Sequence, residues 1–161
     1  MVLVKKGKGM LLALETAQAH CSVALSDATG VLAFREDRTP REQTRQILPM
    51  IEAVMAEVGV DFAGLQAVAF ARGPGSFSGI RINTAVAQAL GWAHGLPLLP
   101  VSSLQALAQS AQRQGHVTAC MGVLDARMQE VYAGAFVQDA AGLMQPAGPE
   151  LGLGMMNLFF V

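Results

Sequence analysis

The feature that most constrains the fold is a series of three short apolar runs near the start of the chain. They cover Met10–Thr16, Cys21–Asp27 and Val31–Asp37. Apolar stretches of this length, bounded by turn residues, are typical of β-strands. The break DATG favours a tight turn, because Gly30 tolerates a positive φ angle and Asp27 can bond local amides. The sequence therefore predicts a three-stranded meander.

A helix is predicted next, over Thr39–Gly59. Its core-facing stripe recurs at helical spacing and consists of Ile47, Ile51, Val54 and Val58. Leu48 and Met55 form a second apolar line, which indicates another buried face against a neighbouring helix or a partner subunit. Gly59 is a favourable helix end. Pro49 lies inside the pattern and predicts either a kink or a late helix start.

The rest of the sequence alternates strand and helix patterns. In order, these are a strand at Gln66–Arg72, a helix rich in small residues at Ser78–His94 that Gly95 stops, a strand at Pro97–Ser102, a helix capped by Ser102 or Ser103 that runs to about Gln112, and a hairpin of Val117–Arg127 and Glu130–Val137. This order predicts an α/β fold of two similar ribonuclease H-like lobes. The first, residues 1–113, would hold a mixed five-stranded sheet with flanking helices. The second, residues 114–161, is expected to be incomplete, with only its first hairpin.

The composition excludes several classes of protein. Hydrophobic residues make up 52% of the 161 residues and charged residues 14%, which is too apolar for a disordered chain. The net charge is -1, whereas a protein that binds nucleic acid on its own usually carries an excess of basic residues. Three lysines precede the first apolar run, but Glu15 interrupts that run, so a secretory signal is not expected.

The length of the apolar runs bears on where the protein works. None approaches the about 18 apolar residues of a membrane span, so we expect a cytoplasmic protein that does not bind membranes. The apolar end of the chain, Leu158–Val161, is expected either to dock on the core or to mark a truncated or out-of-frame end.

The stretch ARGPGSFSGIR, Ala71–Arg81, joins a predicted strand to a predicted helix. A glycine loop before a helix N-terminus can bind an anion, because free amides and the helix dipole point at it. Gly75 and Ser76 would then contact a phosphate. The stretch lacks the Lys-Ser/Thr of a P-loop and the acidic ribose partner of a dinucleotide site. On spacing alone we favour the other interpretation, in which the glycines serve turn geometry and close packing.

Two acidic positions are candidates for metal or phosphate chemistry. Glu15 and Thr16 end the first predicted strand, where an acid could hold Mg²⁺ through water while the following loop binds phosphate. Asp125 and Glu130 cluster at the predicted hairpin and could form a metal or phosphate site facing the first lobe. The simpler alternatives, a strand-end Glu that faces solvent and a solvated charged turn, are favoured.

Histidine and cysteine form no recognisable catalytic pattern. His20, His94 and His116 are each more than twenty positions from the next, which leaves no local metal motif and no Ser-His-Asp or Cys-His arrangement. Cys21 and Cys120 lie in apolar runs, and each is expected to be a reduced, buried thiol.

Five motifs occur in a fixed order along the chain. They are LETA followed by CSVAL, PREQTRQILPMI, ARGPGSFSGIRI, PLLPVSSLQALA and VLDARMQEVYAGAF. Over about Met10–Val137 they closely resemble the bacterial TsaB family, also called YeaZ. The resemblance implies the actin-like ATPase fold and a non-catalytic subunit of the complex that makes N6-threonylcarbamoyladenosine at position 37 of tRNAs. The alternative is an active phosphotransferase or metallopeptidase of the same superfamily.

The same resemblance implies partners and cofactors. The family pairs with a catalytic subunit, TsaD, and an ATPase, TsaE; it forms homodimers in their absence and meets tRNA only indirectly. The subunit itself would require no cofactor, although Mg-ATP could bind at the partner boundary. The catalytic relative carries an H-x-x-x-H metal motif whose positions fall on Ser103 and Leu107 here. Because leucine cannot bind a metal, no metal site is expected.

The family's contact surface is implied to be the pair of helices in the first lobe. It places the partner interface at Leu48, Met55, Ile82, Ala85 and Ala89. The sequence departs from the family where Glu15, Gln43 and Gln129 replace a frequent Asp, His and Gly. The family also continues beyond this chain, which puts a stable second lobe in question but leaves the two helices intact.

Overall fold

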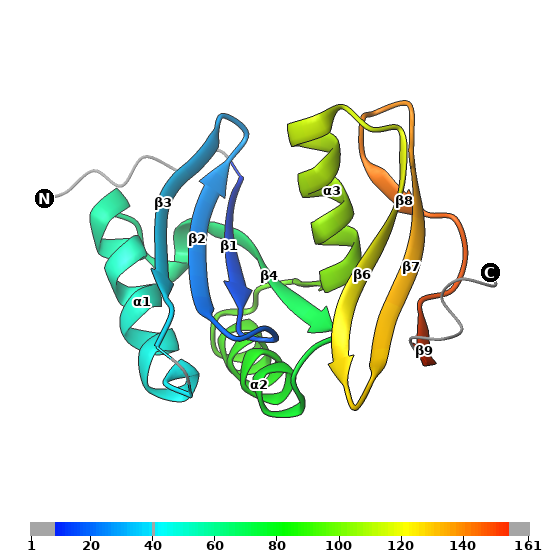
Figure 1. The fold of residues 1–161 in the computed structure, drawn as a ribbon. Helices are drawn as coiled ribbons and strands as arrows, with labels where there is room; N and C mark the ends of the chain where they lie inside the picture. Colours follow the sequence, from blue (N-terminus) through cyan, green and yellow to red (C-terminus); the bar gives the residue numbers. More distant parts are fainter. Residues whose placement is uncertain (1–8, 40, 155–161) are drawn as a thin grey trace, which may run out of the picture. The chain divides into compact units, whose positions relative to one another are not determined.

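The computed structural model describes residues 9–39 and 41–154 (Figure 1). In chain order its elements are β1 (Met10–Glu15), β2 (Cys21–Asp27), β3 (Gly30–Asp37), α1 (Gln43–Val58), a 3-10 turn (Phe62–Gly64), β4 (Leu65–Gly73), α2 (Phe77–His94), β5 (Leu98–Ser102), α3 (Ser103–Gly115), β6 (Ala119–Arg127), β7 (Glu130–Gln138), β8 (Met144–Pro146) and β9 (Leu151–Gly154). Their contacts form two compact units. The first lies within residues 1–72 and 76–100, and the second within residues 73–75 and 101–161.

The first unit contains a five-stranded mixed sheet in the order β3-β2-β1-β4-β5. The first three strands form the predicted meander, with β2 antiparallel to both neighbours. β4 pairs with β1 in parallel, so that Ala13 lies between Ala24 and Ala69. The helices α1 and α2 contribute apolar side chains to the same core as the sheet. The structure thus confirms the predicted first lobe of a mixed sheet with flanking helices.

The core of the first unit is large. Among the described residues it contains fifteen buried apolar side chains. Leu12 and Leu14 of β1 alternate with less buried neighbours, as expected for a strand with one face on the core. The predicted stripe of α1 faces them, since Ile47, Ile51 and Val54 are at most 2% exposed. The helical periodicity in the sequence therefore identified the correct core face of α1.

Two expectations for α1 are corrected by the structure. The helix begins at Gln43, six residues before Pro49, so the late start is wrong, while the alternative of a kink at Pro49 stays a prediction. Met55 belongs to the core and is 6% exposed, whereas Leu48 is 52% exposed. Both project from nearly the same side of the helix, since they are two turns apart. Beyond the helix end the amide of Val60 donates to the carbonyl oxygen of Met55, and Val60 and Phe62 pack against the core that contains Met55.

The predicted caps lie at the ends of the helices. Gly59 and Gly95 take the left-handed conformation after α1 and α2, with φ of 72° and 65°. Ser102 caps α3, because its hydroxyl accepts from the amide of Gln105. Among the described helices, none combines the length and the apolar character that crossing a bilayer would require.

The second unit contains a four-stranded sheet built around β7. β6 and β7 form the predicted hairpin. The expectation that this lobe holds only one hairpin is wrong, because β7 also pairs with β8 at residues 136–138 and with β9 at residues 130–133. The end Leu158–Val161 lies outside the described residues.

Helix α3 belongs to the second unit by its contacts. Leu104 and Ala108 of this helix pack with Phe136 and Met144 of the sheet. The amide of Met144 also donates to the side chain of Gln109 at 2.8 Å. The division suggested by the sequence, after residue 113, would place α3 with the first lobe instead. Its apolar stripe faces the second sheet, and this explains the difference.

Candidate functional site

In the first unit, the turn after β1 lies against the first turn of α2. Thr16 is fully buried, and its hydroxyl donates to the carbonyl oxygen of Gly79 at 2.7 Å. The amide of Ser76 donates to the carbonyl oxygen of Ala17, also at 2.7 Å. A Cβ atom built on Gly79 would stand 1.9 Å from the Thr16 carbonyl oxygen, so only glycine fits there. This geometry supports close packing as the role of the glycine-rich stretch.

The amides at the start of α2 have partners within the protein. Ser76 is the N-cap, and its hydroxyl accepts from the amide of Gly79 at 3.2 Å. Its own amide is bound to Ala17, as described above. A phosphate at these two amides would have to displace protein oxygen atoms. Gly75 is half-buried and groups with the second unit, and its contact with a phosphate stays a prediction.

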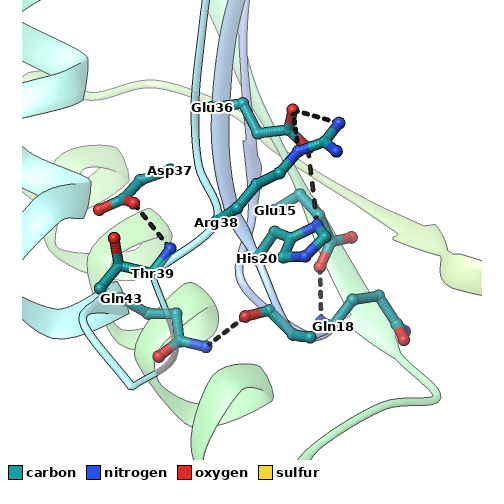
Figure 2. A network of polar contacts seen from close by, with 9 residues as sticks. Glu15, Gln18, His20, Glu36, Asp37, Arg38, Thr39 and Gln43 are labelled. Carbon is teal, nitrogen blue, oxygen red and sulfur yellow. Dashed lines mark hydrogen bonds and ion pairs between the residues drawn. The ribbon is translucent and has the colours of Figure 1, made fainter.

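Glu15 closes the turn after β1 with its own carboxylate (Figure 2). The Oε1 atom of Glu15 accepts bonds from the amides of Ala17 and Gln18, the second at 3.2 Å. Burial raises the pKa of the Glu15 carboxyl group, and the two amide bonds lower it in part. The favoured expectation of a strand-end Glu that faces solvent is therefore wrong, because the side chain turns back onto the backbone.

Asn83 is a buried polar residue that the sequence reasoning missed. Its side-chain amide donates to the carbonyl oxygens of Leu14 at 3.1 Å and Ala71 at 3.0 Å, near the ends of the parallel strands β1 and β4. Its Oδ1 atom has no hydrogen-bond partner among the described residues. A signal was present in the sequence, because the buried line of α2 recurs every four residues: Gly79, Asn83, Ala87 and Gly91.

The candidate acids of the second unit lie at an exposed turn. The Asp125 side chain accepts a bond from the amide of Arg127 at 2.7 Å, and Glu130 lies opposite Arg127 in the strand register of the hairpin. Arg127, Met128 and Gln129 have positive φ angles of 66°, 54° and 63°. The arrangement agrees with the favoured interpretation, a solvated charged turn. A phosphate contact of Asp125 stays a prediction.

Two of the three histidines have local side-chain partners, and His116 lies at the C-cap of α3. His20 lies 3.6 Å from Glu36, and His94 stacks on Phe62 with ring centroids 4.2 Å apart. Within residues 9–39 and 41–154, no three His, Cys, Asp or Glu side chains gather as metal ligands would. The expectation that this subunit uses no metal stays a prediction.

Both cysteines are free thiols. Cys21 is buried, and this burial, followed by the charges of Asp37 and Glu15, raises the pKa of its thiol to about 11. Cys120 is only half-buried. The expectation of a buried thiol is thus confirmed for Cys21 and wrong for Cys120, which packs only partly buried against the core of the second unit.

The outward face of α2, on the side opposite the buried line, is exposed and carries both polar and apolar side chains. Ser78, Arg81 and Gln88 are its polar members. Its apolar members are Phe77, Ala85, Ala89 and Trp92. Trp92 is 92% exposed and Phe77 is 73% exposed, with the guanidinium of Arg81 stacked 3.9 Å from the centroid of the Phe77 ring. We call this set the α2 face. Ala85 and Ala89 were expected here, and the two aromatic residues were missed.

The remaining predicted interface positions differ from one another. Leu48 is exposed on α1, as an interface residue should be. Ile82 is half-buried and packs against the core of the first unit. Met55 lies inside that core, so its assignment to a partner surface is wrong.

Comparisons with known proteins point to one pathway. The family model for TsaD, described as tRNA N6-adenosine threonylcarbamoyltransferase, matches residues 37–151. A protein of Escherichia coli (strain K12), described as "tRNA threonylcarbamoyladenosine biosynthesis protein TsaB", is 39% identical over 133 residues, which is 83% of this chain and 57% of that relative. The solved structure "YeaZ from Pseudomonas aeruginosa" is 40% identical with a TM-score of 0.85, and the match covers 91% of this chain and 68% of that one.

A more distant match concerns the fold alone. The ROK hexokinase of Thermus thermophilus is 15% identical with a TM-score of 0.51, over 78% of this chain and 45% of that one. Together with YeaZ, it confirms the predicted actin-like, ribonuclease H-like fold. The chain spans only 57% of the Escherichia coli relative and 54% of the Haemophilus influenzae relative.

Proposed function

This chain belongs to the TsaB (YeaZ) family of tRNA threonylcarbamoyladenosine biosynthesis proteins, and we propose that it is a non-catalytic scaffold subunit that binds a TsaD-type transferase. In this proposal the complex makes N6-threonylcarbamoyladenosine at position 37 of tRNA, and the subunit meets tRNA only through its partners. It requires no cofactor of its own, and Mg-ATP, where needed, binds at the partner boundary. A TsaE-type ATPase joins the complex, and the chain forms a homodimer when both partners are absent.

The observation that carries the proposal is the α2 face. Trp92 and Phe77 lie at its two ends, and both side chains are largely exposed to solvent. Aromatic side chains are among the residues that contribute most to the binding energy of protein interfaces. Ala85 and Ala89 lie between Trp92 and Phe77, and their small side chains would let a partner helix approach closely. Leu48 on α1 adds an exposed apolar side chain to the same unit.

A catalytic role has less support in the geometry. An active phosphotransferase would need the turn after β1 and the start of α2 to be available to phosphate. Instead, the Glu15 carboxylate and the Ala17 carbonyl oxygen occupy the amides of both segments. Because these amides are already bonded within the protein, the geometry supports a non-catalytic role better than a phosphotransferase role.

The test measures binding to a TsaD-type transferase. Isothermal calorimetry would compare the full chain with Ala89→Glu and Leu48→Arg. Each variant should weaken binding at least about tenfold, because a charge on a desolvated contact has no partner to offset it. Each should also shift the chain alone toward monomer in light scattering.

A matched control is Ala111→Glu, an exposed alanine on α3. It introduces the same charge on a helix of the second unit and should leave binding unchanged. If the full chain, with a folded first unit, fails to bind the transferase, the scaffold proposal is wrong. If Ala89→Glu and Ala111→Glu bind equally well, the α2 face is not the contact surface.

A further inference from the structure

The sheet of the second unit has two faces of different kinds. One face carries the core cluster with Phe136 and Met144. The members of the opposite face follow from strand alternation and from the register of β6, β7 and β9. Its apolar members are Ala119, Met121, Val123, Val131, Ala133, Ala135, Val137, Leu151 and Leu153. We call this set the Met121 face.

The exposure of the Met121 face changes along β7. Val131 and Ala133 pair with β9 and are buried. Beyond the end of this pairing, Met121, Ala135 and Val137 are exposed. An apolar sheet surface normally packs against a second layer of the fold. Among the described residues, the half of the face that lies beyond β9 is still open to solvent.

The segment that follows β9 is strongly apolar. It consists of residues 155–161 and reads MMNLFFV, in which every residue except Asn157 is apolar and no side chain is charged. Removal of such side chains from water contributes about 25 cal/mol per Å² of apolar surface. The segment follows directly on β9, whose Leu151 and Leu153 belong to the Met121 face. It therefore starts at the border of a surface with the same apolar character.

We propose that residues 155–161 fold back onto the Met121 face and cover its exposed half. The length of the segment is sufficient. Gly154 pairs with Glu130, so Ala135 lies five residues further along β7, which is about 17 Å in a strand. Seven extended residues span about 23–25 Å, which leaves about two residues for the reversal of the chain.

The segment and the face are complementary in size and charge. Ala119 and Ala135 are small and exposed, and they leave room above the sheet beside Met121 and Val137. In an extended segment, alternate residues point the same way, so either Leu158 with Phe160 or Phe159 with Val161 would face the sheet. Each of these pairs brings one phenylalanine, a side chain that buries about 150–250 Å².

The polar residues of the same face do not oppose this contact. Asp125 lies opposite Val131, at the buried end, and Gln145 lies opposite Val137, at the far end. The competing occupant is a second copy of this chain. A tethered segment has an effective concentration of about millimolar, so it is favoured over a free chain at micromolar concentration. The covered face is then closed to association with other chains.

The test uses the full chain with ¹³C-labelled methionine methyl groups and a soluble paramagnetic agent, which broadens the NMR signals of methyl groups that solvent reaches. Met121 is the reporter. Met128, which is 90% exposed, and Met144, which is fully buried, are the internal references. In the full chain the Met121 methyl group should be protected like that of Met144. Deletion of residues 155–161 should remove this protection and leave both references unchanged.

The contact itself is tested by a double substitution, Phe159→Ser with Phe160→Ser. In the full chain, nuclear Overhauser effects should connect the Met121 methyl group to phenylalanine ring protons, and the double variant should lose them. Phe34→Ser is the matched control, because it removes an exposed phenylalanine of β3 in the first unit. It should leave the signals of Met121 unchanged.

A charge on the face keeps the test valid if the shortened chain does not fold. Ala135→Glu retains residues 155–161 but places a carboxylate under them, so Met121 should again lose its protection. Ala111→Glu, on an exposed position of α3, should not have this effect. Equal broadening of Met121 in the full chain, the shortened chain and Ala135→Glu would overturn the proposal. So would Overhauser effects between labelled and unlabelled chains in a mixed sample, because a second copy would then be the occupant.

Discussion

The two units of the chain bury very different amounts of apolar surface. Among the described residues, the core of the first unit has fifteen buried apolar side chains, whereas that of the second has four. Full burial of an aliphatic or aromatic side chain contributes about 1.5–3 kcal/mol, so the difference is large compared with the net stability of a domain. The loss of one core residue should therefore destabilise the second unit by a larger share of its total stability than the first.

The sheets of both units also carry exposed apolar side chains, such as Phe34 of β3 in the first unit, which is 51% exposed. In the second unit, Met121 of β6 is paired with Ala135 of β7, and Val137 of β7 with Ala119 of β6, on the face opposite the Phe136 cluster. Met121 is 51% exposed and Val137 is 44% exposed. The buried residues Val131 and Ala133 of β7 lie on this same face, so the face is apolar and only partly exposed.

The largest effect is expected from Phe136→Ala. Phe136 is 1% exposed and is the largest side chain of the four-residue core. Its truncation should cost about 3–5 kcal/mol and unfold the second unit while the first remains folded. Hydrogen exchange with mass spectrometry would detect this as lost protection of β6 and β7 alone.

The corresponding truncation in the first unit is Val54→Ala, at a fully buried position of α1. It should weaken the first unit without unfolding it, because fourteen other core residues remain. If Phe136→Ala instead removes protection from α1 and β1 as well, the two units unfold together and the comparison fails.

The next largest effect is expected from Gly79→Ala. The added Cβ atom would overlap the backbone oxygen of Thr16, at 1.9 Å, so α2 must shift from the sheet at a cost of about 1–3 kcal/mol or more. Gly122→Ala is its counterpart in the second unit, where the nearest atom is the Leu104 carbonyl oxygen at 3.0 Å. Chemical denaturation should show a clearly smaller loss for Gly122→Ala. Equal losses of stability would mean that the backbone around Thr16 shifts to accommodate the added Cβ atom as easily as the backbone around Gly122 does.

These positions also show how much the sequence could predict. The stripe of α1, the caps and the meander follow from periodicity and turn residues, and each is confirmed. β8 and β9 were missed because they are short and rich in glycine and proline, and only their pairing with β7 makes them strands. Leu48 and Met55 could not be told apart, because helical periodicity places both on one side of α1 and only tertiary packing buries Met55 and leaves Leu48 exposed.

The candidate site was less predictable than the fold. The sequence placed Glu15, Thr16 and Ser76 in two separate motifs, and the structure brings these motifs together through Gly79 and Ala17. The direction of the Glu15 side chain depends on the conformation of the following turn, which local residue preferences do not fix. For the same reason, the aromatic ends of the α2 face were missed, because exposure is set by the packing of the opposite side of the helix.

The two cysteines provide a smaller and purely kinetic comparison. At pH 8 the thiolate fraction of Cys21 should be about a hundredfold below that of an ordinary thiol, because its pKa is raised from 9.0 to about 11. Its 2% exposure protects it further. Cys120 is half-buried in the smaller unit and should react with iodoacetamide far faster. Peptide mass spectrometry would measure the two rates, and similar rates would mean that the first unit opens as readily as the second.

The smallest effect concerns the hairpin turns. The β2–β3 turn of the first unit places Gly30 at φ 133°, whereas the β6–β7 turn of the second unit places three non-glycine residues at positive φ. Gln129→Gly should therefore stabilise the second unit by about 0.5–1 kcal/mol, because glycine adopts φ 63° without the steric cost of a Cβ atom. Gly30→Ala, the opposite change, should destabilise the first unit by more, since alanine is strained at φ 133° even in open space. Urea denaturation followed by exchange of β7 and β3 amides would give both values. A loss of stability in Gln129→Gly would mean that the greater freedom of glycine in the unfolded chain outweighs the strain, and the second turn would then be as well suited to its residues as the first.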